Sequence, residues 1–200
     1  MNTFSPEYFS ELFDQNPDPW GFRTRWYEAR KRALTLACLP RATYRYGYEP
    51  GCANGELAAD LAARCERLLV SDCAARAVAS ARLRLADMPH VEIAQLQTPN
   101  EWPEADFDLI VVSEIAYYLS EDSFTRLSEI LRLALNNGAT VVAVHWRHPI
   151  TSCTLTGDDV HGLWTKRFQI SPVCGYTDND ANVDVWCLDG GSVAEREGLV

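Results

Sequence analysis

The segment best suited to chemistry is Glu49-Pro50-Gly51-Cys52-Ala53-Asn54-Gly55, which follows a predicted strand and opens a predicted helix. Its two glycines permit a tight turn and close approach of a ligand to the backbone. The N–H groups at the start of the helix can bind an anionic group. A dinucleotide-binding loop needs G-x-G-x-x-G, but Ala53 and Glu56 occupy the second and third glycine positions. An acidic residue, any residue, a glycine and a second glycine four residues later is instead the S-adenosylmethionine-binding pattern. The expected cofactor contacts from this segment are Glu49, Gly51, Cys52 and Gly55.

Polar side chains also follow the next two predicted strands, at the sheet edge where open α/β folds bind ligands. Asp72 ends the second strand, where its carboxylate can accept hydrogen bonds from both ribose hydroxyls of a nucleoside. Acidic residues also begin helices as N-caps, so a structural role is the alternative. Gln97 and Thr98 follow the third strand and can bind the polar edge of an adenine, or serve only as turn residues. Together with Cys73, these residues complete the predicted nucleoside site.

Strands four and five end in residues that can act on a methyl acceptor. Glu114 directly follows an apolar strand, and we expect it to contact the cofactor together with Ile115. Glu114, His145 and His161 are the candidate bases or amine-orienting groups. Histidines are often structural and aromatic residues often fill cores, so packing roles are the alternative. The candidate acceptor contacts are Tyr117, Tyr118, Trp146 and Arg147.

The elements that must position these residues alternate between β-rich runs and helical patterns, which indicates right-handed βαβ units and a parallel sheet. The strand at 108–112 is apolar after its first residue, as expected for a strand buried on both faces. The helix at 120–136 is amphipathic, with Ser120 as its N-cap and Asn136-Asn137-Gly138 as its end. The predicted strands are Tyr44–Tyr48, Leu68–Ser71, Val91–Ala94, Asp108–Val112 and Thr140–Val144, with helices at Glu56–Arg64, Ala74–Ala86 and Ser120–Asn136.

Further elements are predicted on both sides of this central part. Most basic residues between positions 23 and 41 are expected on a solvated helix face. Residues 175–182 read as a polar loop, and residues 190–200 as a frayed tail. The predicted helices are Pro6–Phe13, Arg25–Leu39 and Asp158–Arg167, and the predicted late strands are Phe168–Val173 and Val183–Leu188.

The composition is that of an ordinary globular protein, with 47% hydrophobic and 23% charged residues among 200. Its formal net charge of -10 would repel a nucleic acid, so we expect no such partner. Seven cysteines without CxxC spacing predict reduced thiols and no metal site. The first fifteen residues contain no apolar run, and no stretch reaches about 18 apolar residues. We therefore expect a cytoplasmic protein without a secretory signal or a membrane partner.

A series of ordered motifs resembles the NodS-like class I S-adenosylmethionine-dependent methyltransferases. The resemblance runs from about Tyr8 to about Lys166. Asn136-Asn137-Gly138-Ala139 replaces the usual Pro-Gly-Gly turn before the fifth strand, a change that should not affect binding. The motifs that carry the resemblance are Asp18-Pro19-Trp20-Gly21, Trp26-Tyr27-Glu28-x-Arg30-Lys31, Glu49-Pro50-Gly51-Cys52, Ser113-Glu114, Tyr117-Tyr118-Leu119, His145-Trp146-Arg147-His148-Pro149 and Gly157-Asp158-Asp159-Val160-His161.

This resemblance implies a doubly wound α/β fold. Its seven-stranded, mostly parallel sheet would have the order 3-2-1-4-5-7-6, with helices on both faces and the last-added strand antiparallel. It also implies a single domain over 1–200, with an N-terminal helical lid at 1–42, a Rossmann-like core at 43–189 and the tail at 190–200. Trp20 and Arg30 would close over the cofactor, and Arg30 could pair with its methionyl carboxylate.

The expected reaction is transfer of a methyl group from S-adenosylmethionine to a small-molecule or oligosaccharide acceptor. Founding members of the family N-methylate a partly deacetylated chitin oligosaccharide during nodulation-signal synthesis. The alternatives are an O-methyltransferase, a non-catalytic S-adenosylmethionine-binding protein and a nicotinamide-binding protein. The glycine spacing disfavours the last of these. The sequence leaves open the acceptor, the methylated atom and the oligomeric state.

Overall fold

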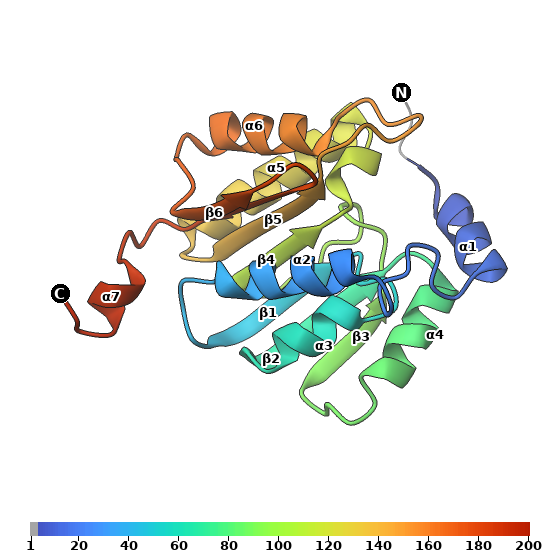
Figure 1. Ribbon diagram of the computed structural model, residues 1–200, viewed down its shortest axis with the longest axis horizontal. Coiled ribbons are helices and arrows are strands. Elements are labelled where there is room, and N and C mark those ends of the chain that lie inside the picture. Colours follow the sequence, from blue (N-terminus) through green and yellow to red (C-terminus); the bar gives the residue numbers. More distant parts are fainter. Residues whose placement is uncertain (1–3) are drawn as a thin grey trace.

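The computed structural model describes residues 4–200 and contains one seven-stranded sheet with the order β3-β2-β1-β4-β5-β7-β6 (Figure 1). Strands β1 to β5 are parallel to one another, whereas β7 runs antiparallel to both β5 and β6. The predicted doubly wound fold and strand order are therefore confirmed. The strands are β1 (Tyr44–Pro50), β2 (Cys65–Asp72), β3 (Val91–Gln95), β4 (Leu109–Ser113), β5 (Thr140–Trp146), β6 (Cys174–Thr177) and β7 (Ala181–Trp186).

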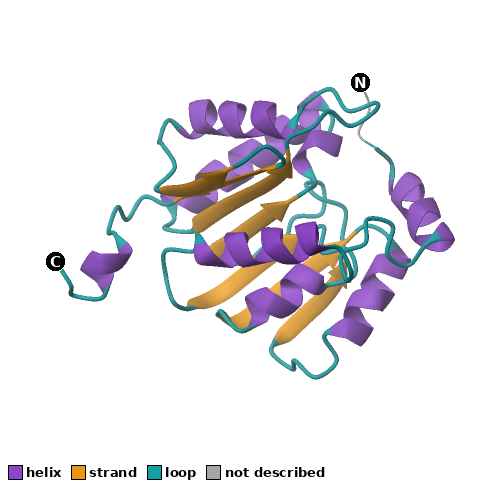
Figure 2. Cartoon of the chain, viewed as in Figure 1, coloured by secondary structure: helices purple, strands orange, loops and turns teal. Residues whose placement is uncertain are grey.

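Helices cover both faces of the sheet (Figure 2), because the buried strands carry apolar residues on both sides. In β5, Val142 and Val144 pack in the cluster that contains α3 and α4 residues. Val141 and Ala143 point to the opposite cluster, with α5 and α6. Within residues 4–200, no helix is both long and apolar enough to cross a membrane. The helices are α1 (Pro6–Gln15), α2 (Trp26–Ala37), α3 (Glu56–Ala62), α4 (Ala75–Arg84), the 3₁₀ helix η1 (Ala116–Tyr118), α5 (Glu121–Asn136), α6 (Gly157–Phe168) and α7 (Val193–Arg196).

The two N-terminal helices have different positions. Helix α1 lies beside α4 (Figure 1), where Phe13 packs on Ala74 and Ala77. Helix α2 crosses one face of the sheet, and Cys38 and Leu39 at its end join the core cluster of that face. The second helix of the expected lid is therefore also part of the packed helix layer.

The late strands and the tail differ from the sequence prediction. Phe168 closes α6, and Gln169 ends that helix in a left-handed conformation at φ 59°, so 168–173 is not a strand. The strand lies instead at Cys174–Thr177 and pairs with Ala181–Trp186. Both strands include residues of the expected loop at 175–182. As an edge strand, β6 alternates half-buried with exposed residues. It was not predicted because it contains no apolar run. The tail contains α7, which Ser192 and Glu195 begin with a capping box.

Candidate active site

The turn after β1 is held in one conformation by backbone hydrogen bonds. The N–H groups of Gly51 and Cys52 both donate to the Ser71 carbonyl, at 2.7 and 2.8 Å. Gly51 has φ 76°, and a Cβ there would lie 2.4 Å from Cγ2 of Ile115. Any side chain at position 51 would therefore be strained and would push away the strand-four loop. Gly55, also at positive φ, serves as the N-cap of α3 and is not among the cavity-lining residues.

Glu49 lies at the end of β1, just before this turn, and is buried, with 2% of its surface exposed. Its Oε2 atom has no hydrogen-bond partner among the described residues. Burial, followed by the negative charges of Asp72 and Asp60, raises the pKa of Glu49 to about 8. A buried carboxylate without a partner, on a cavity wall, fits a cationic ligand group.

Asp72 supports the turn and faces two pockets. Its two carboxylate oxygens accept hydrogen bonds from the N–H groups of Ala53 and Ala74, at 3.0 and 2.9 Å. Burial raises the pKa of Asp72, although these two hydrogen bonds oppose the shift. Asp72 borders both the main cavity and a smaller pocket of about 90 Å³. The smaller pocket is lined by the predicted residues Gly51, Asp72, Cys73, Gln97, Thr98, Ile115 and Tyr118, together with Phe4, Pro6, Phe9, Leu96 and Leu119.

The main cavity has a volume of about 560 Å³, within the range of small-molecule sites. Its walls come from α1, the loop before α2, α2 itself and the carboxyl ends of β1, β2, β4 and β5. The predicted residues that line it are Trp20, Glu49, Gly51, Cys52, Asp72, Glu114, Ile115, Tyr117, Tyr118 and Trp146.

Glu114 lies at the centre of a buried charge cluster. It adopts φ 61°, which is uncommon for a residue with a side chain and marks a constrained position. Its Oε1 atom accepts a 2.6 Å hydrogen bond from Nζ of Lys31 on α2. Its Oε2 atom accepts from the Trp146 N–H at 2.9 Å and from the Tyr117 hydroxyl. The carboxylate therefore has three donors and is held firmly in place.

Lys31 bridges Glu114 to a second carboxylate, that of Glu28, at 3.0 Å. Burial acts to lower the pKa of Lys31, but the charges of Glu114 and Glu28 outweigh it, and the net shift is upward. Burial raises the pKa of Glu28, and the charge of Lys31 opposes that shift. The Lys31 ammonium also lies 5.1 Å from the ring centre of Tyr27, whose ring contacts Trp146 edge-to-face. These groups form a wall of carboxylates and aromatic rings.

Helix α2 supplies this wall because its buried residues are polar. They are Glu28, Lys31 and Thr35, which helical spacing places on one face. A helix normally buries an apolar stripe, so a buried face of this kind must pack on a polar site. Glu28 and Lys31 were not among the predicted site residues, although their i, i+3 spacing within the predicted helix was a signal for them.

Two predicted arginines lie outside the cavity lining. Arg30 donates to Asp178 at 2.6 Å and to the Tyr176 hydroxyl, so the expectation that it holds the methionyl carboxylate is not supported by this geometry. Arg147 forms a two-point ion pair with Asp158, both bonds at 2.8 Å. Both arginines are held at the turn between β6 and β7, where Arg147 also donates to the Asp178 carbonyl.

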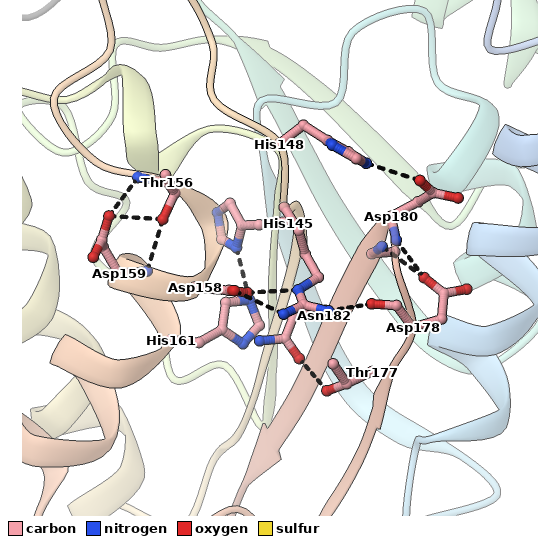
Figure 3. A network of polar contacts seen from close by, with 12 residues as sticks. His145, His148, Thr156, Asp158, Asp159, His161, Thr177, Asp178, Asp180 and Asn182 are labelled. Atoms are coloured by element: carbon pink, nitrogen blue, oxygen red, sulfur yellow. Dashed lines mark hydrogen bonds and ion pairs between the residues drawn. The ribbon is translucent and has the colours of Figure 1, made fainter.

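The two predicted histidines also lie outside the cavity lining, and both are buried. His145 has no exposed surface, and its Nδ1 atom lies 3.1 Å from Nε2 of His161 (Figure 3). His161 in turn contacts Asp184 at 2.7 Å. Burial, followed by His161 and Lys31, lowers the pKa of His145 well below its usual value. Neither ring is placed to take a proton from a ligand in the cavity.

The cavity wall is strongly acidic. Six carboxylates line it against three cationic side chains, those of Arg25, Lys31 and Arg32. Lys31 and Arg32 are paired with acidic residues, whereas no ion pair of Arg25 occurs among the described residues. The cavity therefore favours a positively charged ligand, with Arg25 available for an anionic group. The six carboxylates belong to Glu28, Glu49, Glu56, Asp72, Glu114 and Asp180.

Comparison with known proteins gives consistent similarities. The sequence model of the family described as Nodulation protein S (NodS) matches residues 10–146. A Nodulation protein S from Rhizobium tropici is 31% identical over 127 residues, which are 62% of this chain and 53% of that protein. The chain thus spans about half the length of the curated relatives that it matches.

Solved structures show the same similarity. A Pseudomonas syringae protein assigned to the methyltransferases is 44% identical, with a TM-score of 0.70 over 81% of this chain and 99% of that one. The N-methyltransferase NodS from Bradyrhizobium japonicum WM9, in complex with S-adenosyl-L-homocysteine, has a TM-score of 0.66 at 22% identity. That match covers 88% of this chain and 96% of the other, and shares the fold.

Proposed function

The chain belongs to the nodulation protein S family of S-adenosylmethionine-dependent methyltransferases, and from this premise we propose that it methylates the amine of a small acceptor. One observation carries the proposal. A single cavity is bordered by the glycine turn, by Asp72 and by the Glu28–Lys31–Glu114 cluster. Groups suited to a nucleoside and groups suited to an amine therefore share one space.

The residues around the turn fit the cofactor. The unpartnered Glu49 oxygen suits the α-ammonium group, and Asp72 keeps lone pairs for ribose hydroxyls. The cofactor supplies an electrophilic methyl group on a sulfonium, and the protein mainly provides positioning and exclusion of water. The smaller pocket beyond Asp72, with Gln97 and Thr98 in its wall, suits the adenine.

We assign the methionyl carboxylate to Arg25 and not to Arg30. Arg25 lines the cavity and lies outside the ion pairs of the described residues, whereas Arg30 is occupied by Asp178. A guanidinium can bind a carboxylate through two parallel hydrogen bonds. Substituting each arginine in turn can therefore show which of the two binds the methionyl carboxylate.

The acceptor class follows from the charge of the wall. An acidic cavity attracts an amine in its cationic form, and Tyr27, Tyr117 and Trp146 offer aromatic surfaces to a cation or a sugar ring. The similarity to an N-methyltransferase supports nitrogen as the methylated atom. An oligosaccharide amine, such as that of a deacetylated chitooligosaccharide, is one member of this class.

Glu114 is better suited to orient the amine than to remove its proton. Both of its oxygens already accept hydrogen bonds, one of them from the ammonium of Lys31. A neutral amine can donate a hydrogen bond to a remaining lone pair and direct its own lone pair at the methyl carbon. An amine that enters protonated must lose one proton to water before the attack, and the methylated ammonium product can release another proton to water afterwards.

The direct test is a methyl-transfer assay with a panel of acceptors. We expect product from small amines and glucosamine oligomers, and little from the N-acetylated or hydroxyl-bearing counterparts of the same size. Calorimetry with S-adenosylhomocysteine measures cofactor binding in parallel. Binding without transfer to any acceptor would favour the non-catalytic alternative, and product only from hydroxylated acceptors would favour O-methylation. Binding of a nicotinamide cofactor instead of S-adenosylhomocysteine would exclude both N-methylation and O-methylation.

A further inference from the structure

Two buried histidines, the half-buried Asp184 and one amide form a continuous series of hydrogen bonds next to the cavity wall that Glu114 and Tyr117 line. The N–H of Ala116 donates to Nε2 of His145 at 3.3 Å. Nδ1 of His145 lies 3.1 Å from Nε2 of His161, and Nδ1 of His161 lies 2.7 Å from Oδ2 of Asp184. The series thus joins β7, α6 and β5 to η1, behind Glu114 and Tyr117.

The direction of every bond follows from the first one. Because an amide can only donate, Nε2 of His145 must be unprotonated. The proton of this ring is therefore on Nδ1 and points to His161, whose Nε2 must accept it. The proton of His161 is then on Nδ1 and is donated to Asp184. Both rings are neutral while the series is intact, and each donor has one acceptor.

We propose that Asp184, His161 and His145 form a directional hydrogen-bond chain that positions loop 114–118 for methyl transfer. The chain fixes the loop in two ways. It holds the Ala116 amide, and the ring of His145 packs edge-to-face on Tyr117 at 5.2 Å. Tyr117 donates to Glu114, so the orientation of this carboxylate depends on both contacts. These are positioning residues, because the chain ends at an amide that cannot pass on a proton.

Close packing keeps the chain together. Gly157 begins α6 against the end of β5, where a Cβ would lie 2.9 Å from Cβ of His145. The same helix carries His161. Trp164 and Trp186 are fully buried against the two rings and shield the bond between them from water, whereas Asp184 at the end of the chain is half-buried.

The first test is nitrogen NMR of the imidazole rings. The protein has four histidines, so substitution of each one assigns its signal. In the wild-type protein we expect His145 and His161 both as neutral Nδ1–H tautomers. The Ala116 amide should exchange slowly with solvent. An Nε2–H tautomer at either ring, or a cationic His161, would overturn the proposal. Both readouts use the protein alone and do not depend on the methyl-transfer activity.

The second test uses a matched pair of variants. In His145→Gln, the side-chain oxygen can occupy the position of Nε2 and still accept from Ala116, whereas the shorter side chain of His145→Asn cannot reach it. We expect His145→Asn to lower kcat about 10- to 100-fold and to speed exchange of the Ala116 amide, with an unchanged affinity for S-adenosylhomocysteine. His145→Gln should recover most of both losses.

The kinetic part of this test rests on the proposed function, and it needs a control variant. His90→Gln, at a histidine that contacts the Ala62 carbonyl, should leave kcat unchanged. Equal losses of kcat in the Asn and Gln variants, or no loss in either, would contradict the proposal. If His145→Asn does not fold, Asp184→Ala removes the far end of the chain, and it should lower kcat while KM for the acceptor stays constant. A wild type without transfer activity would contradict the proposed function and leave the NMR result to decide the chain.

Discussion

Glu49 shows most clearly how burial prepares one side chain for a ligand. It is an acid without a hydrogen-bond partner on one of its oxygens, in a cavity that holds other carboxylates. At neutral pH, with its pKa raised to about 8, it is mostly protonated in the absence of a ligand. A bound ammonium group would favour the ionised form, so binding and proton release are linked.

We therefore predict that the affinity for S-adenosylhomocysteine increases with pH between 6 and 8. Below pH 8 the carboxyl must lose its proton on binding, and the increase approaches about tenfold per pH unit. Calorimetry in buffers of different ionisation enthalpy should detect release of a proton. Glu49→Gln should bind more weakly and without this pH dependence. A flat profile in the wild type would remove Glu49 from the ammonium site.

In contrast to Glu49, Glu114 should affect turnover and not cofactor affinity, because it lies in the part of the cavity that we assign to the acceptor. Glu114→Gln weakens the bond to Lys31 and should lower kcat about 10- to 100-fold, with a nearly unchanged dissociation constant for S-adenosylhomocysteine. Glu92→Gln, the same change at an exposed residue paired with Arg67, is the matched control. Lost cofactor affinity with unchanged turnover would assign Glu114 to cofactor binding instead.

At the scale of elements, α6 offers two glycines with opposite surroundings. A Cβ at Gly157 would lie 2.4 Å from the Trp146 carbonyl oxygen, whereas nothing lies within 4 Å of one at Gly162. Gly157→Ala should lower the melting temperature and kcat together, because α6 must move away from β5. Gly162→Ala should stabilise the helix by about 0.5–1 kcal/mol without affecting kcat. Thermal unfolding of both variants checks this, and equal stability changes would contradict the packing described here.

The sequence predicted the five parallel strands because they are short β-rich runs, most of which are separated by regular helical patterns. Its errors lie where a local pattern conflicts with long-range structure. Strand β6 pairs only with β7 at the sheet edge, and such a half-exposed strand has no apolar run to identify it. Arg30 and His145 have the residue types of a site, but their partners are far away in sequence, at Asp178 and His161. Spacing alone cannot predict such pairs.

At the scale of the whole molecule, net charge and cavity charge have the same sign. The protein carries a formal charge of -10, and five carboxylates line the cavity besides Glu49, which is mostly protonated at neutral pH. Attraction of a cationic amine over several ångströms should therefore assist its association. Salt shortens the range of this field to about 10 Å at 0.1 M and about 3 Å at 1 M.

We predict that kcat/KM for a cationic amine falls severalfold as NaCl rises from about 0.05 to 0.5 M, while kcat changes little. Asp180→Asn removes a half-exposed carboxylate at the cavity and should reduce the slope. Steady-state kinetics at constant pH measures both quantities. A value of kcat/KM that does not depend on salt would argue that the acceptor enters uncharged.

Three consecutive residues of α2 are bound to three separate parts of the protein. Arg30 pairs with Asp178 in the β6–β7 turn, Lys31 with Glu114 after β4, and Arg32 with Asp60 on α3. Most basic residues of this segment were expected on a solvated face, with Arg30 over the cofactor, but these three are all paired. Their ion pairs add to the packing of Cys38 and Leu39 at the end of the helix. A rotation of one long side chain can open a single pair, but a movement of α2 as one body would have to open all three. Thermal fluctuations of single side chains should therefore leave this wall of the cavity in place, since each broken pair leaves two others to hold the helix.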